Sequence, residues 1–190
     1  RLGADGQFRY DARWAFTDVE ERTSFEWLID EIRAAIVSDP RAHVYHYAPY
    51  EPSAFKRLMG RYGTREDEVD RLLRGEIFVD LYRVVRQGVR ASVESYSIKK
   101  LEPLYELTRE VELRDAGSSI AEFEEFLQLS EREQPEAEHL EKIRLYNRDD
   151  VLSTWRLRDW LEARRTELIA HGTEVPRPTP GDPEPAEDLG

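Results

Sequence analysis

The sequence predicts an α/β domain, because short segments rich in β-forming residues alternate with amphipathic helical segments. Two of these segments, residues 43–47 and 77–80, are each followed closely by a helical pattern. An earlier run, residues 7–16, alternates aromatic or apolar side chains with mostly polar ones, which is typical of a half-buried antiparallel strand. These observations indicate a mixed sheet flanked by helices.

Local signals define the expected helices. Thr17 and Glu20 form a capping box that begins a helix, and Pro40 follows its end. Pro52 suits the first position of the next helix, which makes Glu51 its cap residue. That helix is expected to end between residues 60 and 63. The further helices that we expect span residues 64–75, 81–85, 95–105, 118–127 and about 139–170.

The last of these helices carries an apolar stripe that polar residues interrupt. The stripe consists of residues 140, 143, 151, 154, 157 and 161. Tyr146 and Asp150 are four positions apart, so a helix places them on one face. A partly buried carboxylate is costly unless it is paired, hydrogen-bonded or bound to a cation. Asp150 is therefore either ion-paired with an Arg or part of a site.

Acidic side chains also follow the two inner strands. Glu51 lies just beyond residues 43–47, and Asp80 ends residues 77–80. Open α/β sheets build their sites beyond the carboxyl ends of strands. Glu51 is thus either a site acid or only a helix cap, a position for which Glu is a poor choice. Asp80 is either a structural residue at the strand end, an acid that positions other site residues, or an acid that itself acts as a ligand.

Composition and charge restrict the class of protein. The 190 residues fit one domain, residues 1–171, followed by a proline-rich acidic linker or disordered tail, residues 172–190. A net charge of -12 argues against attraction of nucleic acid by the whole surface. The sequence contains no cysteine, no signal pattern and no long apolar run, so we expect a cytoplasmic protein without a membrane partner.

The motifs together resemble the DEDD, or DnaQ-like, 3′–5′ exonucleases of the ribonuclease H-like fold. They are more narrowly similar to the ribonuclease H-like domain of predicted RecB-like nucleases, in which a helicase domain follows. Tyr146-Asn-Arg-Asp-Asp150 resembles the third family motif, Tyr-x-x-x-Asp. The segment from His46 to Glu51 stands at the second motif, Asn-x-x-x-(Phe/Tyr)-Asp, with His for Asn and Glu for Asp.

Two further segments extend the resemblance to residues 8–165. Asp80-Leu-Tyr resembles the Asp-Thr-Leu strand of the family, and residues 95–102 resemble its Ser-Leu-x-x-Leu helix. The resemblance implies a ribonuclease H-like fold that lacks its first strand or two. It also implies a metal-dependent 3′–5′ exonuclease acting as one module of a larger nuclease–helicase polypeptide.

The resemblance also assigns roles to site residues. Glu51 and Asp150 would bind Mg²⁺ or Mn²⁺ in a two-metal site, because hard cations prefer carboxylate oxygen. Two such ions can stabilise the attacking and leaving oxygens of a phosphodiester. Tyr146 would orient the attacking water, and His46 and Asp80 would support the site. A His-x-x-His zinc site is not predicted, because a regular strand places His43 and His46 on opposite faces.

The first family motif, Asp-x-Glu, departs from the pattern. Asp18-Val-Glu20 matches its letters but lies in the capping box, directly before a helix. We expect the true pair upstream of Arg1, so this chain alone would be inactive although the full-length protein would be a hydrolase. The alternative is a non-catalytic nucleic-acid-binding or interaction module with a degenerate site.

A basic stretch predicts contact with nucleic acid; we expect DNA as the partner rather than RNA, although the residues of the stretch do not choose between them. Between Leu81 and Leu101, five basic residues stand against one acid. The residues that could follow a phosphate backbone are Arg83, Arg86, Arg90, Lys99 and Lys100, and Tyr96 could stack on a base. The alternative interpretation of this stretch is a solvated charged face.

Overall fold

The computed structural model describes residues 7–110, 138–178 and 181–184. Its elements are α1 (Asp18–Ser38), β1 (Val44–His46), α2 (Tyr50–Tyr62), α3 (Glu66–Arg74), β2 (Phe78–Asp80), α4 (Leu81–Gly88), α5 (Ile98–Leu101), η1 (Glu102–Tyr105) and α7 (Glu138–Ala170). The predicted α/β class, with a small sheet flanked by helices, is confirmed. The helix predicted at residues 118–127 lies outside the described residues.

The two strands pair in parallel and end at the same level. Val44 lies opposite Phe78, and His46 lies opposite Asp80. Successive residues of a strand point to opposite faces of the sheet. Phe78 accordingly packs on one hydrophobic cluster, whereas Val79 packs on the other. The short sheet thus separates two cores and brings its carboxyl ends together.

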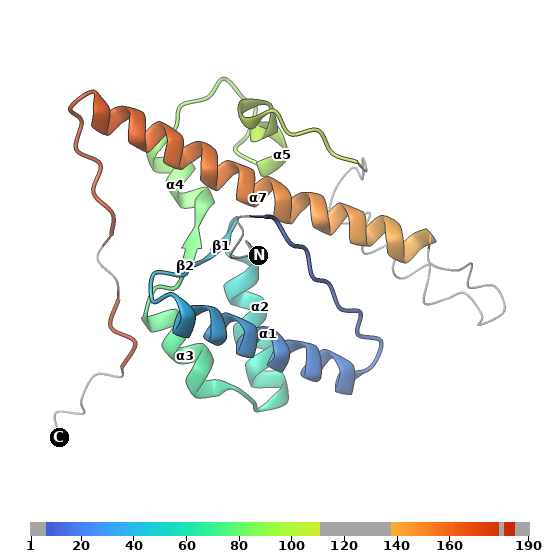
Figure 1. Cartoon of the computed structure of the whole chain (residues 1–190). Helices are drawn as coiled ribbons and strands as arrows, with labels where there is room; N and C mark the ends of the chain where they lie inside the picture. Colours follow the sequence, from blue (N-terminus) through green and yellow to red (C-terminus); the bar gives the residue numbers. More distant parts are fainter. Residues whose placement is uncertain (1–6, 111–137, 179–180, 185–190) are drawn as a thin grey trace.

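The first core joins α1, α2 and α3 beneath the sheet (Figure 1). Its buried residues are Phe25, Ile29, Phe55, Val69 and Leu72. The capping box predicted at Thr17 and Glu20 is present, which explains where α1 begins. Gly63 ends α2 at a φ of 54°, a left-handed conformation that glycine adopts at little cost.

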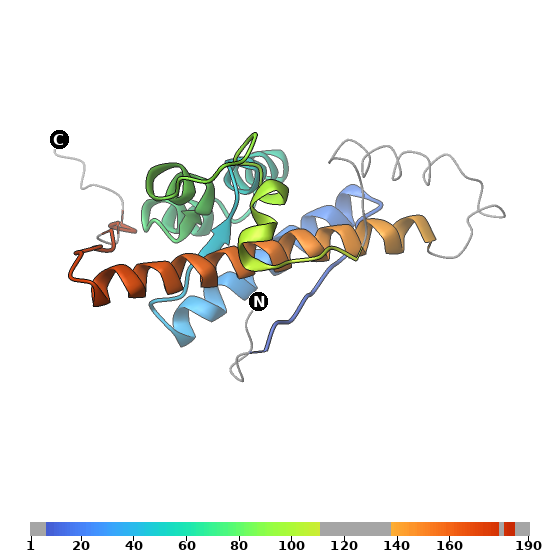
Figure 2. The ribbon, with the colours of Figure 1, turned by 90° about the horizontal axis from the view of Figure 1, so that it is seen from above.

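The second core lies along α7, which crosses the whole molecule (Figures 1 and 2). Its buried residues are Leu81, Val85, Leu101 and Leu157, contributed by α4, α5 and α7. Leu157 has no exposed surface. The long helix therefore connects the basic segment and the sheet to one scaffold.

Within the part of the chain that the structure describes, no helix is long and apolar enough to cross a membrane.

The strand predicted at residues 7–16 is wrong. Apart from an isolated bridge at Phe8, this segment has no regular secondary structure. The Phe8 ring stacks on Trp155 of α7, with 5.2 Å between centroids, and the Arg13 guanidinium lies 3.8 Å from the centroid of the Trp27 ring of α1. Phe8 and Arg13 of this segment thus contact helices, and Trp14 stacks on Phe16 of the segment itself.

Two local predictions about helices also require correction. Glu51 is not the cap of α2, because that helix begins at Tyr50 and Pro49 occupies the cap position. Val151, predicted in the buried stripe of α7, is 42% exposed. Asp149 and Ser153 are buried instead, so polar side chains occupy much of the inner face of this helix.

The packing of α7 leads to a prediction about stability. Leu157→Ala should lower the free energy of unfolding by about 2–5 kcal/mol, because it leaves a cavity in the second core. Val151→Ala, in the same helix but exposed, is the matched control and should change it by less than about 0.5 kcal/mol. Urea unfolding followed by circular dichroism measures both. Equal losses in the two variants would contradict this packing.

Candidate functional site

The carboxyl ends of the two strands are locked together by hydrogen bonds. Asp80 Oδ1 accepts from the backbone N–H groups of Ala48, at 3.0 Å, and Tyr82, at 2.9 Å, so it also caps α4. Ala48 has a φ of 67°, an uncommon conformation for a residue with a Cβ. His46 Nδ1 donates to Ala48 O at 2.7 Å. Asp80 and His46 thus hold the turn that leads to Glu51.

Glu51 lies in the first helical turn of α2, which follows directly after the chain turns at Ala48. Its Oε2 atom is buried and has no hydrogen-bond partner among the described residues, although His46 Nδ1 lies 3.7 Å away. Burial raises the pKa of Glu51 above its ordinary value, and the charges of Asp80 and Asp150 raise it further against the opposing effect of His46. Glu51 therefore shares an electrostatic environment with both other acids.

Asp150 reaches this region from α7 and is ion-paired. Its Oδ1 atom lies 2.7 Å from Nη1 of Arg109, and its side chain is 38% exposed. Burial raises the pKa of Asp150, while Arg109 and Lys99 act in the opposite direction. The net shift is upward, so these cations only partly compensate for the loss of solvent.

Tyr146 lies one turn before Asp150 and is buried. The Lys99 ammonium is 4.9 Å from the centroid of its ring, and the Arg109 guanidinium is 5.6 Å from it. Cations at such distances are attracted to the negative face of an aromatic ring. The aromatic ring of Tyr146 thus lies close to the same two cations that oppose the rise in the pKa of Asp150.

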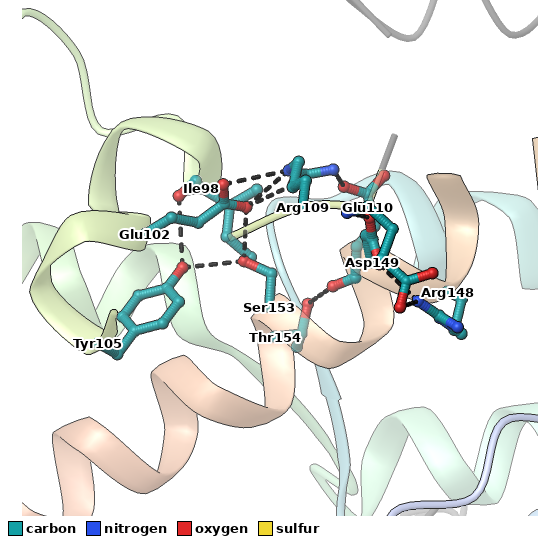
Figure 3. A network of polar contacts seen from close by, with 10 residues as sticks. Ile98, Glu102, Tyr105, Arg109, Glu110, Arg148, Asp149, Ser153 and Thr154 are labelled. Carbon is teal, nitrogen blue, oxygen red and sulfur yellow. Dashed lines mark hydrogen bonds and ion pairs between the residues drawn. The ribbon is translucent and has the colours of Figure 1, made fainter. Parts of the chain in front are cut away.

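A buried polar network holds Arg109 in place (Figure 3). Arg109 donates from Nε and Nη2 to the carboxylate of Glu102, at 2.6–3.1 Å. Ser153 Oγ donates to Glu102 at 2.9 Å and also hydrogen-bonds to the Tyr105 hydroxyl, at 2.9 Å. The network joins the segment after α5 to the inner face of α7, beside Asp150.

A second group of contacts secures the same segment one residue further on. Asp149 is almost fully buried and accepts from the Glu110 backbone N–H at 2.8 Å. Arg148 contacts both Asp149, at 3.3 Å, and the Glu110 carboxylate, at 2.5 Å. Adjacent aspartates of α7 therefore have different surroundings. Asp149 fixes the backbone of the segment, and Asp150 contacts its Arg side chain.

The described residues do not complete the divalent-cation site that the resemblance implies. Among them, no group of three or more His, Cys, Asp or Glu side chains is arranged to hold a metal ion. Glu51 offers a buried carboxylate oxygen without a hydrogen-bond partner there, which suits a cation. Asp150, however, already contacts the guanidinium of Arg109.

The residues of the basic stretch have varied surroundings. Arg83, Arg86 and Arg90 belong to the predicted phosphate-contact surface, and Lys99 lies half-buried beside Tyr146. Lys100 pairs with Glu94 at 2.9 Å. Tyr96 is half-buried: its hydroxyl donates to Val89 O at 3.1 Å, and the Arg86 guanidinium lies 5.7 Å from its ring centroid. The contacts of Lys100 and Tyr96 do not exclude them, so all six residues stay a predicted contact surface for nucleic acid.

The Asp18 and Glu20 pair lies away from the acids of the candidate site. Glu20 completes the capping box, and Asp18 pairs with Arg61 at 2.7 Å. Arg61 lies ten positions beyond Glu51 in α2, a rise of about 15 Å along a helix. The pair therefore has a local structural role at the opposite end of α2.

Sequence reasoning missed Arg109 and Glu102. The sequence places Arg109 only in a charged loop, and Glu102 only at the end of a helix motif. One available signal is Ser153, a small polar residue at the position where α7 continues its inner face after Asp150. A buried hydroxyl needs a partner, which indicates a polar group packed against that face.

The raised pKa of Glu51 predicts a cost to stability. With metal chelated, Glu51→Gln should raise the midpoint of thermal unfolding at pH 7, because ionised Glu51 destabilises the folded state. The cost is complete above the folded pKa and absent below the ordinary value, 4.5, so the gain should disappear as the pH falls.

The matched control is Glu94→Gln. A hydrogen bond and the charge of Lys100 lower the pKa of Glu94, so this change should have the opposite sign. Calorimetry from about pH 4 to about pH 8, which brackets these pKa values, measures both variants. A Glu51→Gln midpoint at or below that of the unchanged chain at pH 7 would contradict the electrostatic environment described above.

Comparison with known families agrees with the fold. The model of the RNase_H superfamily matches residues 5–162, which is more than half of the chain. Comparisons with curated proteins and with solved structures gave no significant match. The match spans β1, β2, the candidate site acids and most of α7. The chain belongs to the RNase H superfamily.

Proposed function

We propose that this domain is a metal-dependent nuclease of the DEDD 3′–5′ exonuclease type, acting on nucleic acid and on DNA in preference to RNA. Membership of the RNase H superfamily supports a nuclease-type activity on nucleic acid. Nucleases of this fold generally use divalent metal ions. The finer proposal, a RecB-like nuclease module beside a helicase domain in one polypeptide, rests on the resemblance of the motifs.

The observation in the structure that best supports this proposal is the buried Oε2 atom of Glu51, which has no hydrogen-bond partner among the described residues and would suit a cation. Asp150 is far from Glu51 in the sequence, yet its charge adds a small contribution to the raised pKa of Glu51, after burial and Asp80. Like charges are brought together at a cost, and functional sites are where proteins commonly accept that cost. Glu51 and Asp150 would provide two ligands for Mg²⁺ or Mn²⁺, and the remaining ligands would come from outside the described residues.

Tyr146 has a supporting part in the proposal. It lies on the same helix as Asp150 and is buried beside Lys99 and Arg109. Its phenol would orient the water that attacks the phosphodiester, and the two cations would keep the ring in place. His46 and Asp80 would position Glu51 through the turn at Ala48.

One observation favours a second function, a nucleic-acid-binding module with a degenerate site. Arg109 contacts Asp150, where an active nuclease would need a carboxylate that is available to bind metal. Glu also stands where the resembling family has Asp. Such a module would use the basic residues after β2 without cleaving its ligand.

A nuclease assay on the full-length polypeptide distinguishes these functions. With Mn²⁺, Asp150→Asn should reduce the rate at least about a hundredfold, because it weakens a metal ligand. Tyr146→Phe should reduce it by up to about a hundredfold while leaving Mn²⁺ affinity nearly unchanged, because only the water-orienting hydroxyl is removed. The 190-residue chain alone should cleave little.

The control for this assay is Asp159→Asn, an aspartate of α7 that pairs with Arg158. Its rate should stay within about twofold of the unchanged protein. A polypeptide that cleaves equally well with Asp150→Asn uses another site, and the binding-module function would then stand. Absence of cleavage by the unchanged polypeptide would reject the nuclease function and leave the binding-module function.

The basic stretch provides a separate prediction about binding. Arg83→Ala, Arg86→Ala, Arg90→Ala and Lys99→Ala should each weaken binding of single-stranded DNA similarly for all sequences. The salt dependence should fall by about one unit for each phosphate that is no longer bound. Arg22→Ala, an Arg of α1 paired with Glu26, should have no effect. Fluorescence anisotropy at several salt concentrations measures this, and unchanged slopes in all four variants would leave only a solvated face.

A further inference from the structure

Arg109 is a cation that contacts one of the proposed metal ligands. Its side chain is only 9% exposed, and it lies between two carboxylates, Glu102 and Asp150. Burial lowers the pKa of Arg109, but hydrogen bonding and charge from these carboxylates outweigh burial and raise it, so the guanidinium is charged. The chain thus places its own positive charge where a nuclease of this type would bind an ion.

The two carboxylates hold Arg109 in different ways. Glu102 accepts three hydrogen bonds from Nε and Nη2, at 2.6–3.1 Å. Asp150 makes a single contact with Arg109, whose Nη1 atom lies 2.7 Å from Oδ1 of Asp150. Directed charge-assisted bonds are the stronger kind. Glu102 is therefore the anchor of Arg109, and Asp150 is the partner that can exchange it for another cation.

A divalent ion cannot bind Oδ1 of Asp150 without displacing the guanidinium. Mg²⁺ binds carboxylate oxygen at about 2.0–2.1 Å and requires near-octahedral geometry. An ion on Oδ1 of Asp150 would lie beside Nη1 of Arg109, and like charges repel strongly in a partly buried site. Contact with Arg109 and coordination of an ion are thus alternative states of this carboxylate oxygen, and an ion on Oδ2 would meet the same repulsion at a longer distance.

We propose that Arg109 excludes a divalent cation from Oδ1 of Asp150, so that this carboxylate binds metal tightly only after Arg109 has moved away from it. The inference rests on the proposed function, because it concerns the same metal ligand. Glu102 and Ser153 retain Arg109 nearby in both states. Arg109 acts as a positioning residue that holds Asp150 until an ion replaces it.

The test measures Mn²⁺ binding rather than cleavage. Arg109→Met alone would leave Glu102 buried and unpaired, which could unfold the chain. The variant Glu102→Gln/Arg109→Met removes both charges, and the introduced amide oxygen can still accept from Ser153. It is also a stringent test, because it removes a carboxylate that would itself attract the ion.

Paramagnetic resonance of free Mn²⁺, after the full-length polypeptide of the nuclease assay has been stripped with a chelator, reports the affinity of the unchanged chain and of each variant. The double variant should bind Mn²⁺ roughly tenfold more tightly than the unchanged chain, and adding Asp150→Asn should abolish that gain. Arg148→Met is the matched control, because Arg148 contacts Asp149 and Glu110. Its affinity should equal that of the unchanged chain. Circular dichroism confirms that each variant is folded.

Three results would overturn the inference, and they distinguish it from the proposed function. Equal, Asp150-dependent binding in the unchanged chain and the double variant would show that Arg109 does not exclude metal, while the metal site itself would stand. Absence of Asp150-dependent binding in both would reject the exclusion and the metal-ligand role of Asp150 together. A gain that survives Asp150→Asn would place the ion elsewhere and also reject the inference.

Discussion

The ion pair between Glu102 and Arg109 is the interaction on which the candidate site depends. Both side chains are 9% exposed, so either charge alone would be costly. The pair is satisfied by three hydrogen bonds of its own and by Ser153 of α7. Because these contacts join two parts of the chain, they determine where the segment after α5 lies against α7, and hence which groups surround Asp150 and Tyr146.

The short sheet provides the other half of the site. Parallel pairing places His46 and Asp80 side by side, and the hydrogen bonds of Asp80 turn the chain sharply at Ala48 into α2. Glu51 then emerges in the first turn of that helix. The strand ends and α7 thus carry Glu51 and Asp150, two acids from distant parts of the sequence, and the charge of Asp150 contributes slightly to the raised pKa of Glu51.

Signals that act over a few residues are sufficient to predict much of the fold. The capping box at Thr17, the β-forming runs and Gly63 each predict an element that is present. The strand prediction for residues 7–16 fails because an alternating pattern does not reveal whether a segment meets a strand or, as here, Trp155 and Trp27 of two helices. Sequence alone cannot give Arg109 a partner, because its contact with Asp150 depends on how a loop packs against a distant helix.

The negative charges of the candidate site are incompletely compensated at both of its ends. Around Glu51, burial and two other acids raise the pKa, and the nearby His46 compensates only in part. Around Asp150, two cations approach, yet burial still raises the pKa. A region in which both carboxylates remain incompletely compensated has a favourable interaction left for added positive charge. Arg109 supplies such a charge to Asp150, whereas the buried Oε2 atom of Glu51 has no hydrogen-bond partner among the described residues.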